Sequence, residues 1–452
     1  MRTNVAERKP VVTTHECARA VKATPVDQLR RSVMACMLFE DTFYEDGVSI
    51  ADRIHAEVAD VLRLKTGADI VGNIAYEART KFKLRHAPLW LIVALIKAAT
   101  DEDRAVVAGA IASCVQRPDE MAELIAMYWK DGKRPLTAQM KKGLAAAFQK
   151  FDRYSLSKYA NKPGQVAMRD VLFLVHAKPQ DEDQIALFRD LAENKLKAPD
   201  TWESSLSAGK DKKTTFERLI AEKQLGALAL LRNLRNMQEA GVEDGIIRQA
   251  LAAMKTERVL PFRFITAARY APKLEPELET AMFRCLEDVP KLQGKTLLLV
   301  DNSGSMYGTK VSAKSEIDRS DAACALAMLL REVCDNCQVI VFADEAAMIR
   351  PRRGFALRDE IKRSRQGGTD IGNAVRVAAD EGYDRIIVIT DEQTMANGVY
   401  NKSNVPDPLP GTKGYFINVA CYQNGVGYRA WTHIDGFSEA TLDFIQQYES
   451  QQ

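Results

Sequence analysis

One short apolar run that ends in an acid decides the fold class of this chain: Leu297-Leu298-Leu299-Val300-Asp301-Asn302-Ser303-Gly304-Ser305. The run has the length of a buried strand of a parallel sheet, and serines then follow at every second position. Open α/β sheets bind their ligands in the crevice beyond the carboxyl ends of such strands. The stretch therefore predicts a strand that presents a loop of small oxygen ligands.

Two later stretches predict the other parts of the same site. Gly367-Gly368-Thr369-Asp370 places a hydroxyl just before a helix, and Ile386-Ile387-Val388-Ile389-Thr390-Asp391 is a second buried strand that ends in an acid. Together they offer only hard oxygens, which suit magnesium or manganese and not zinc. We predict that one divalent cation, Mg²⁺ or Mn²⁺, is held by five residues: Asp301, Ser303, Ser305, Thr369 and Asp391.

The pattern Asp-x-Ser-x-Ser has a structural alternative, because serine-rich turns after strands are common. The full set of five residues resembles the metal-ion-dependent adhesion site of von Willebrand factor A domains. Three of the five ligands are neutral hydroxyls, which leaves the ion short of negative charge. We therefore expect it to accept a carboxylate or phosphate oxygen from a partner at an open position.

The composition is that of an ordinary soluble protein, with 46% hydrophobic and 27% charged residues. Residues 1–20 lack the apolar core of a signal peptide, and the longest apolar run, Ala87 to Ile96, is too short to cross a bilayer. The 8 cysteines show no disulfide framework, and the single Cys334/Cys337 pair lacks the further ligands of a zinc site. We expect free thiols, a cytoplasmic location and no membrane contact.

The first part of the chain, up to about residue 290, shows apolar residues at helical spacing and almost no strand patterns. Successive amphipathic helices of this kind predict an α-solenoid of HEAT-type repeats. Polar residues 198–213 are expected to form a loop. The predicted helices are Val26–Phe39, Ile50–Leu64, Leu89–Ala99, Ile111–Trp129, Leu136–Phe151, Ile185–Leu196, Leu225–Met237 and Ile246–Met254.

After residue 291 the pattern changes to strands that alternate with helices, which indicates a mostly parallel sheet covered by helices. Strands are expected at 296–300, 338–342, 386–390 and 414–419, and helices near 320–333, 357–364, 371–380 and 437–447. The predicted fold class is α + α/β. Residues 1–290 form the helical module, with residues 1–20 as an arm that packs on the second domain, and residues 291–452 form a doubly wound parallel sheet.

Basic residues of the helical part alternate with aromatic ones, which suits phosphate contacts combined with base stacking. Lys150, Tyr154 and Lys158 lie four residues apart and are predicted to share one helical face. The alternative is that such cations only solvate helix faces. His176 ends the apolar run Val171 to Val175, which by itself is more typical of a core histidine than of a ligand.

The order of segments resembles the Ro autoantigen family, in which a TROVE module of helical repeats is followed by a von Willebrand A domain. The resemblance spans nearly the whole chain in order. It rests on the metal motif and on Leu29-Arg30-Arg31-Ser32, Leu84-Arg85-His86-Ala87-Pro88-Leu89, Gln139-Met140-Lys141-Lys142-Gly143-Leu144, Phe148-Gln149-Lys150-Phe151-Asp152, Arg169-Asp170-Val171-Leu172, His176-Ala177-Lys178-Pro179 and Pro261-Phe262-Arg263-Phe264.

The resemblance implies a monomeric, ring-like molecule that binds small noncoding Y RNAs on its outer surface. It also implies that single-stranded 3′ ends of misfolded or decaying RNAs enter the central hole. For bacterial-type relatives it implies a link to a 3′ exoribonuclease, polynucleotide phosphorylase. The implied RNA-binding residues are Lys141, Lys142, Lys150, Lys158, Lys162, Arg169 and His176.

We interpret the chain as a non-enzymatic, RNA-binding ribonucleoprotein scaffold with a role in RNA quality control. One alternative is a metal-dependent adhesion-type module without RNA affinity. Another is a metal-dependent hydrolase with Asp301 as nucleophile. Phosphotransfer enzymes of that type place a second acid two residues on, where this chain has Ser303, and the sequence shows no positioned general base.

Overall fold

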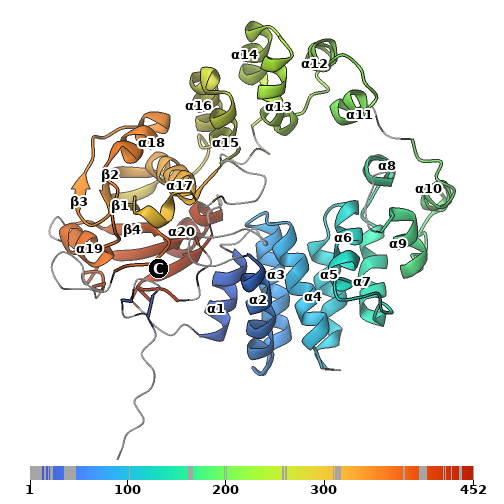
Figure 1. Cartoon of the computed structure of the whole chain (residues 1–452), viewed down its shortest axis with the longest axis horizontal. Helices are drawn as coiled ribbons and strands as arrows, with labels where there is room; N and C mark the ends of the chain where they lie inside the picture. The colour runs from blue at the N-terminus through green and yellow to red at the C-terminus, as the bar shows by residue number, and fades with distance from the viewer. Residues whose placement is uncertain are drawn as a thin grey trace, which may run out of the picture. The chain divides into compact units, whose positions relative to one another are not determined.

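The chain divides into two compact units in the computed structural model, which is drawn in Figure 1. One unit joins Met1–Ile50 to Val289–Gln452, and the other is Ala51–Asp288. Each unit has its own core and is considered by itself. The structure describes residues 13–14, 17–18, 20, 24–34, 47–100, 102–160, 166–197, 199, 201–256, 259, 262–308, 310, 317–379, 382–395, 405–420, 422, 424–428, 430–436 and 440–450.

The unit Ala51–Asp288 is helical throughout its described part, as the sequence predicts. Its elements are α2 (Gly47–Leu62), α3 (Gly67–Thr80), α4 (His86–Ala98), α5 (Arg104–Cys114), α6 (Pro118–Tyr128), α7 (Ala138–Phe148), α8 (Arg153–Ala160), α9 (Met168–Val175), α10 (Glu182–Ala192), α11 (Trp202–Ser207), α12 (Lys212–Ala221), α13 (Ala227–Glu239), α14 (Asp244–Ala253), α15 (Phe262–Tyr270), the 3-10 turn η1 (Pro272–Leu274) and α16 (Glu275–Arg284).

Helices of this unit pack mostly on helices one or two places along the chain, which is the arrangement expected of helical repeats. Helix α3 contacts α4 and α5, α5 contacts α7, and α7 contacts α9; Figure 1 shows α3, α4 and α5 side by side. In α4, all nine residues from Ala87 to Leu95 are buried, because neighbouring helices cover it on several sides. No helix in the described part of the chain is long and apolar enough to cross a bilayer.

Two expectations for this unit were wrong, and local backbone chemistry explains both. The stretch Ile111–Trp129 is two helices, because Pro118 cannot continue α5 and instead opens α6 at its first turn. The polar residues 198–213 contain the short helix α11. Thr201 and Ser204 form a reciprocal capping box that stabilises its start, with Thr201 Oγ1 accepting from the Ser204 amide at 3.2 Å.

The second unit contains one six-stranded sheet with the order β3-β2-β1-β4-β5-β6. Its strands are β1 (Leu292–Asp301), β2 (Cys334–Phe342), β3 (Ala346–Met348), β4 (Arg385–Thr390), β5 (Lys413–Asn418) and β6 (Thr432–Asp435). All neighbouring pairs are parallel except the pair of β2 with the edge strand β3. The predicted parallel sheet is therefore confirmed, with one short antiparallel edge.

Helices cover both faces of this sheet. They are α17 (Arg319–Val333), α18 (Gly354–Arg363), α19 (Ile371–Ala379) and α20 (Ala440–Ser450). Leu297 and Leu299 pack in a buried cluster with α19 residues such as Ile371 and Val375. Since successive side chains of a strand point to opposite faces, Leu298 and Val300 lie on the other face, where they are also fully buried. Helix α17 packs against β1, β2 and β4.

The sequence patterns missed β3 and β6, because strands of three and four residues are too short to show a period. The N-terminal helix α1 (Pro25–Met34) belongs to this unit and packs against β6. Described residues of the predicted arm, residues 1–20, also contact this unit. The Thr14 hydroxyl donates to Thr394 O at 3.0 Å, and Cys17 forms an antiparallel bridge with Met395.

A buried carboxylate in the helical unit provides a first test of the structure. Glu120 is fully buried; its side chain contacts Arg79 at 2.7 Å and accepts from the amides of Gln116 and Arg117 at 2.9 and 3.1 Å. Removing one partner of a buried pair leaves an uncompensated charge, so Glu120→Ala should lower the free energy of unfolding by about 3–5 kcal/mol. Urea denaturation followed by circular dichroism measures this change.

The matched control is Glu193→Ala, because Glu193 is largely exposed and pairs with the exposed Lys195. Surface pairs of that kind contribute at most about 1 kcal/mol. Equal losses in the two variants would contradict the buried Arg79–Glu120 pair.

Candidate metal centre and nucleic-acid interface

The parallel pairing of β1 with β4 brings the two predicted acids to the same edge of the sheet. Val300 pairs with Ile389, so Asp301 at the end of β1 lies beside Thr390, and Asp391 follows directly. The Thr390 hydroxyl donates to Asp301 Oδ2 at 2.5 Å, and the Ser303 amide donates to Asp301 Oδ1 at 2.9 Å. Both carboxylates are buried. The edge therefore concentrates two acids away from water.

Burial and the neighbouring charge oppose ionisation of these acids. Burial, together with the negative charge of Asp391, raises the pKa of Asp301 to about 7, although hydrogen bonds from Ser303 and Thr390 act in the opposite direction. Burial likewise raises the pKa of Asp391. A cation between the two carboxylates would remove this penalty, because an opposite charge favours the ionised form.

The hydroxyls of the predicted set lie where they can complete such a site. Ser303 Oγ and Ser305 Oγ are 3.3 Å apart, and the Ser305 hydroxyl also hydrogen-bonds to Asp391. Asp391 Oδ2 is buried and has no hydrogen-bond partner among the described residues. An unpartnered carboxylate oxygen beside two serine hydroxyls fits a hard cation such as Mg²⁺ or Mn²⁺.

Thr369 reaches the same edge through the Gly367-Gly368 turn. Its carbonyl accepts from Thr394 Oγ1 at 3.0 Å and from the Met395 amide at 2.8 Å, which ties it to the segment after Asp391. A Cβ atom at Gly368 would lie 2.4 Å from Met395 Sδ, so a side chain there would displace the end of the Met395 side chain. Thr369 is itself buried.

All five predicted ligands thus come from three loops that hydrogen bonds hold together. The described residues contain no group of three or more His, Cys, Asp or Glu side chains able to hold a metal ion. The predicted set does not need one, because it combines two acids with three hydroxyls. Its donors are the oxygen atoms that magnesium and manganese prefer.

A buried ion pair involves the residue that follows Asp391. Arg31 of α1 contacts Glu392, the residue after Asp391, at 2.6 Å, and the two side chains are 1% and 0% exposed. The guanidinium also donates to Tyr422 O, to Asn424 O at 3.3 Å and to Tyr428 Oη at 3.2 Å. Burial favours the neutral form of Glu392, but Arg31 outweighs burial, with help from His433, and lowers the pKa of Glu392.

The loop after Asp391 has a backbone conformation that needs such support. Glu392 has φ of 62°, a left-handed conformation that is costly for a residue with a side chain. Its carboxylate also accepts from the Val426 amide at 3.2 Å, and Gly425 leaves room for it, since a Cβ atom at that position would lie 1.8 Å from Glu392 Oε2. Helix α1 therefore helps to fix the loop that carries a predicted metal ligand.

The helical unit brings two of the predicted RNA-binding residues into one pocket of about 480 Å³. Lys141 of α7 and His176 at the end of α9 line it. The other lining residues are Trp129, Lys133, Val166, Asp170, Phe173 and Leu174. Among the described residues, no carboxylate lies within ion-pair distance of Lys133, Lys141 or His176. The pocket therefore combines unpaired basic groups with aromatic rings.

His176 is exposed, so the structure does not support the alternative of a core histidine. It ends α9 in the left-handed conformation, with φ of 52°. The apolar run before it is helical, and buries Val171, Leu172 and Val175 while Phe173 is 52% exposed. The capping residue that follows the helix therefore lies at the surface.

The other predicted RNA-binding cations have different surroundings. Lys142 and Arg169 are exposed, and the Arg169 guanidinium lies 5.6 Å from the Phe173 ring centroid. Lys158 lies 3.7 Å from Glu203. Lys162 lies outside the described residues.

Lys150 is occupied within the protein. Its ammonium donates to Ala112 O and, at 2.9 Å, to Val115 O at the end of α5. It also does not share a helical face with Tyr154 and Lys158, because α7 ends at Phe148 and α8 begins at Arg153. That expectation was wrong, since the turn between the helices interrupts the spacing of four.

The patterns missed several residues that the structure places at these sites. Trp129, Lys133 and Phe173 have no motif of their own, and only the packing of α6, α7 and α9 brings them together. Arg31 had a sequence signal, because it belongs to one of the segments that carry the Ro resemblance. Arg31 lies 361 residues before Glu392, so the sequence alone gave no sign that the two side chains meet.

Two family models match part of the chain. A TROVE domain matches residues 191–333, and a von Willebrand factor type A domain matches residues 296–393. The chain joins a TROVE domain to a von Willebrand factor type A domain. This pair is the one implied by the resemblance to the Ro family, so that prediction is confirmed. The TROVE family is known for RNA binding, and its members are generally not catalytic.

Individual relatives match this TROVE protein over different lengths. Telomerase protein component 1 of Mus musculus is 36% identical over 92 residues, and that of Rattus norvegicus is 34% identical over 92 residues. Each match covers 19% of this chain and 4% of the relative. The crystal structure of the Deinococcus radiodurans RO (RSR) protein has a TM-score of 0.59 and 18% identity, over 94% of this chain and 99% of that one. At that identity the likeness shows the fold alone.

The buried ion pair of Arg31 and Glu392 gives the second prediction. Arg31→Met should lower the free energy of unfolding of its unit by about 3–5 kcal/mol, because Glu392 is left buried without its cation. Replacing both partners, as Arg31→Met with Glu392→Gln, should recover much of this loss, since no buried charge is then unpaired. Differential scanning calorimetry of the two variants and of Glu392→Gln completes the double-mutant cycle. Additive losses would contradict a direct interaction.

Proposed function

We propose that this TROVE protein is a non-catalytic RNA-binding scaffold whose helical unit binds RNA and whose α/β unit holds a divalent cation. The observation that carries the proposal is the pocket in which unpaired basic groups meet the exposed ring of Phe173 and the partly buried ring of Trp129. The proposed ligands are a structured, Y-type noncoding RNA and the single-stranded 3′ ends of misfolded or decaying RNAs. A cytoplasmic role in RNA quality control beside a 3′ exoribonuclease such as polynucleotide phosphorylase is part of the proposal.

The chemistry of the pocket supports an RNA ligand over an acidic protein ligand. Lysine side chains neutralise phosphates, and an aromatic ring stacks on any base. Phe173 is 52% exposed, and Arg169 and Phe173 stack on each other at the surface. Lys150 and Lys158 contribute less directly, because each has a partner within the protein.

The RNA proposal predicts a loss of affinity with a defined salt signature. The triple variant Lys141→Gln, Lys142→Gln and His176→Asn should weaken binding of a structured RNA that carries a single-stranded 3′ end. It should also lower the slope of log affinity against log salt by roughly 0.7 to 0.9 for each phosphate that the protein no longer neutralises. Asparagine is chosen at position 176 because it tolerates the left-handed backbone. Fluorescence anisotropy across a salt series measures both quantities.

The control for this variant is the pair Lys65→Gln and Lys210→Gln, because both lysines are exposed and neither lines the pocket. These changes remove as many lysine charges as the triple variant does, so they separate a local contact from a general charge effect. Equal affinity and equal slope for triple variant and control would exclude the pocket as the RNA site.

In the α/β unit, we propose that Asp301, Ser303, Ser305, Thr369 and Asp391 hold Mg²⁺ or Mn²⁺. The buried, unpartnered Asp391 Oδ2 and the raised pKa of Asp301 support this assignment, since both features disappear when a cation is bound. The ion would supply a positive centre that binds a carboxylate or phosphate oxygen of a partner. The chain's own residues orient the site through the Thr390 and Arg31 contacts.

The metal assignment predicts that Asp301→Asn abolishes manganese binding in isothermal titration calorimetry. The variant keeps the volume of the side chain but removes one of two anionic ligands. Asp335→Asn is the control, because Asp335 is exposed at the start of β2, the opposite end of that strand from the site. Manganese affinity that is the same in Asp301→Asn and the parent protein would show that the ion, if bound, lies elsewhere.

The hydrolase alternative finds little support in the surroundings of Asp301. Both of its oxygens accept hydrogen bonds, and Glu392, the acid next to Asp391, is held by Arg31. A general base needs a free position within reach of the reacting proton. Purified protein should therefore neither cleave RNA nor hydrolyse nucleotides; turnover that disappears with Asp301→Asn would favour the hydrolase.

A further inference from the structure

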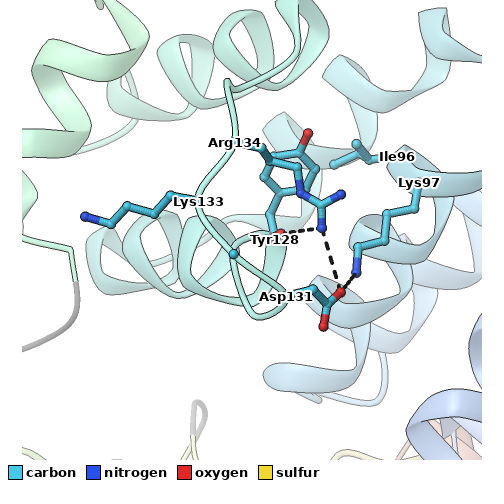
Figure 2. Close-up of a pocket in the computed structure, with 7 residues that line it drawn as sticks. Ile96, Lys97, Tyr128, Asp131, Lys133 and Arg134 are labelled. Atoms are coloured by element: carbon cyan, nitrogen blue, oxygen red, sulfur yellow. Dashed lines mark hydrogen bonds and ion pairs between the residues drawn. The ribbon is translucent and has the colours of Figure 1, made fainter.

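We propose that the loop between α6 and α7, residues 129–137, carries two adjacent subsites for single-stranded RNA: a base-stacking subsite on one side and a phosphate subsite on the other. This inference rests on the proposed RNA-binding function and names the part of the RNA that the loop recognises. The base-stacking subsite is the pocket lined by Trp129, Phe173 and His176. The phosphate subsite is a second pocket of about 570 Å³, shown in Figure 2.

Internal hydrogen bonds hold the loop in one conformation. Trp129 Nε1 donates to Arg134 O at 2.7 Å, and Arg134 Nη2 donates to Tyr128 O at 3.2 Å. Gly132 has φ of 117°, a conformation that side chains rarely adopt, and its amide donates to Trp129 O at 2.9 Å. A loop ordered in this way presents its side chains without a large loss of conformational entropy on binding.

The phosphate subsite has an excess of positive charge. Its charged lining residues are Lys97, Lys133 and Arg134 against the single carboxylate of Asp131. Asp131 Oδ2 lies 2.8 Å from Lys97 Nζ and 3.7 Å from Arg134 Nη2, and Figure 2 shows these three side chains turned toward one another. One carboxylate shared by two cations leaves net positive charge, and the planar guanidinium suits a phosphate.

Lys133 connects the two subsites, because it lines both pockets. Figure 2 shows its side chain directed away from Lys97, Asp131 and Arg134. Its ammonium lies 5.6 Å from the centroid of the Trp129 ring, and Trp129 lines the base-stacking subsite. Lys133 therefore lies between the Trp129 ring and the phosphate subsite. From there it can contact the RNA phosphate next to a base that is stacked in the base-stacking subsite.

The combination favours a single strand over a duplex. The bases of a duplex are stacked on each other, and only unpaired bases are free to stack on protein rings. The base-stacking subsite offers Trp129, Phe173 and His176, with Lys141 and the one acid Asp170 at its wall. A pocket of about 480 Å³ is within the range that accommodates a small ligand of nucleotide size.

The test uses the full chain, a short labelled oligouridylate and a hairpin RNA without single-stranded ends. Phe173→Ala should weaken oligouridylate binding by about 5- to 150-fold, the effect of losing one stacked base. Phe173→Tyr should restore it, because tyrosine keeps the ring. Lys133→Gln should lower the salt slope for the oligouridylate by about 0.7. The hairpin should lose less affinity than the oligouridylate in both Phe173→Ala and Lys133→Gln.

Lys65→Gln serves as the control, since Lys65 is exposed and lines neither pocket, and it should leave the oligouridylate affinity unchanged. Phe173 and Lys133 are both exposed, so the variants are expected to fold, which circular dichroism checks. If Phe173→Ala were misfolded, the salt slope of Lys133→Gln and the oligouridylate affinity of Phe173→Tyr would still test the two subsites.

Three outcomes would overturn the inference, and they differ in what else they overturn. A parent protein that binds neither RNA would overturn the proposed function as well. A parent protein that binds oligouridylate, with Phe173→Ala and Lys133→Gln unchanged, would overturn only the two subsites. Binding of polyglutamate as tight as that of oligouridylate, with the same losses in both variants, would assign the loop to an acidic protein partner.

Discussion

Two buried carboxylates at one edge of a single sheet are the constraint around which the α/β unit is arranged. Asp301 and Asp391 lie there because β1 and β4 pair in parallel and both end at that edge. Burial and the negative charge of Asp391 raise the pKa of Asp301 to about 7, so the ionised form of Asp301 needs stabilising partners. Hydroxyls supply part of this stabilisation, and we propose that a divalent cation supplies the rest.

The same constraint explains why an N-terminal helix belongs to the C-terminal unit. The loop after Asp391 contains Glu392 in a left-handed conformation, and Arg31 of α1 fixes its buried carboxylate. Thr14 and Cys17 contact Thr394 and Met395 in the same loop. Residues near the start of the sequence therefore stabilise a loop that follows β4. We expect a change in α1 to disturb the proposed metal site without removing a ligand.

The sequence predicted the strongly periodic elements well, and it placed the five proposed metal ligands at one edge of the sheet. A buried strand that ends in an acid is a local signal, and three local signals sufficed for Asp301, Thr369 and Asp391. The RNA residues were harder, because spacing of four is informative only within one helix, and α7 ends before Lys150. The ion pair of Arg31 and the rings of Trp129 and Phe173 depend on contacts between distant segments, for which a single sequence carries no spacing signal.

The most direct test of RNA binding by the helical unit is to purify the protein with its cellular RNA, crosslink the complex with ultraviolet light and map the crosslinked peptides by mass spectrometry. We expect crosslinks in the α6–α7 loop and in α9, around Trp129, Phe173 and His176. Lys65 and its surroundings should remain free of crosslinks. RNA that crosslinks only to the unit of β1 to β6, or a protein that purifies without RNA, would contradict the central claim.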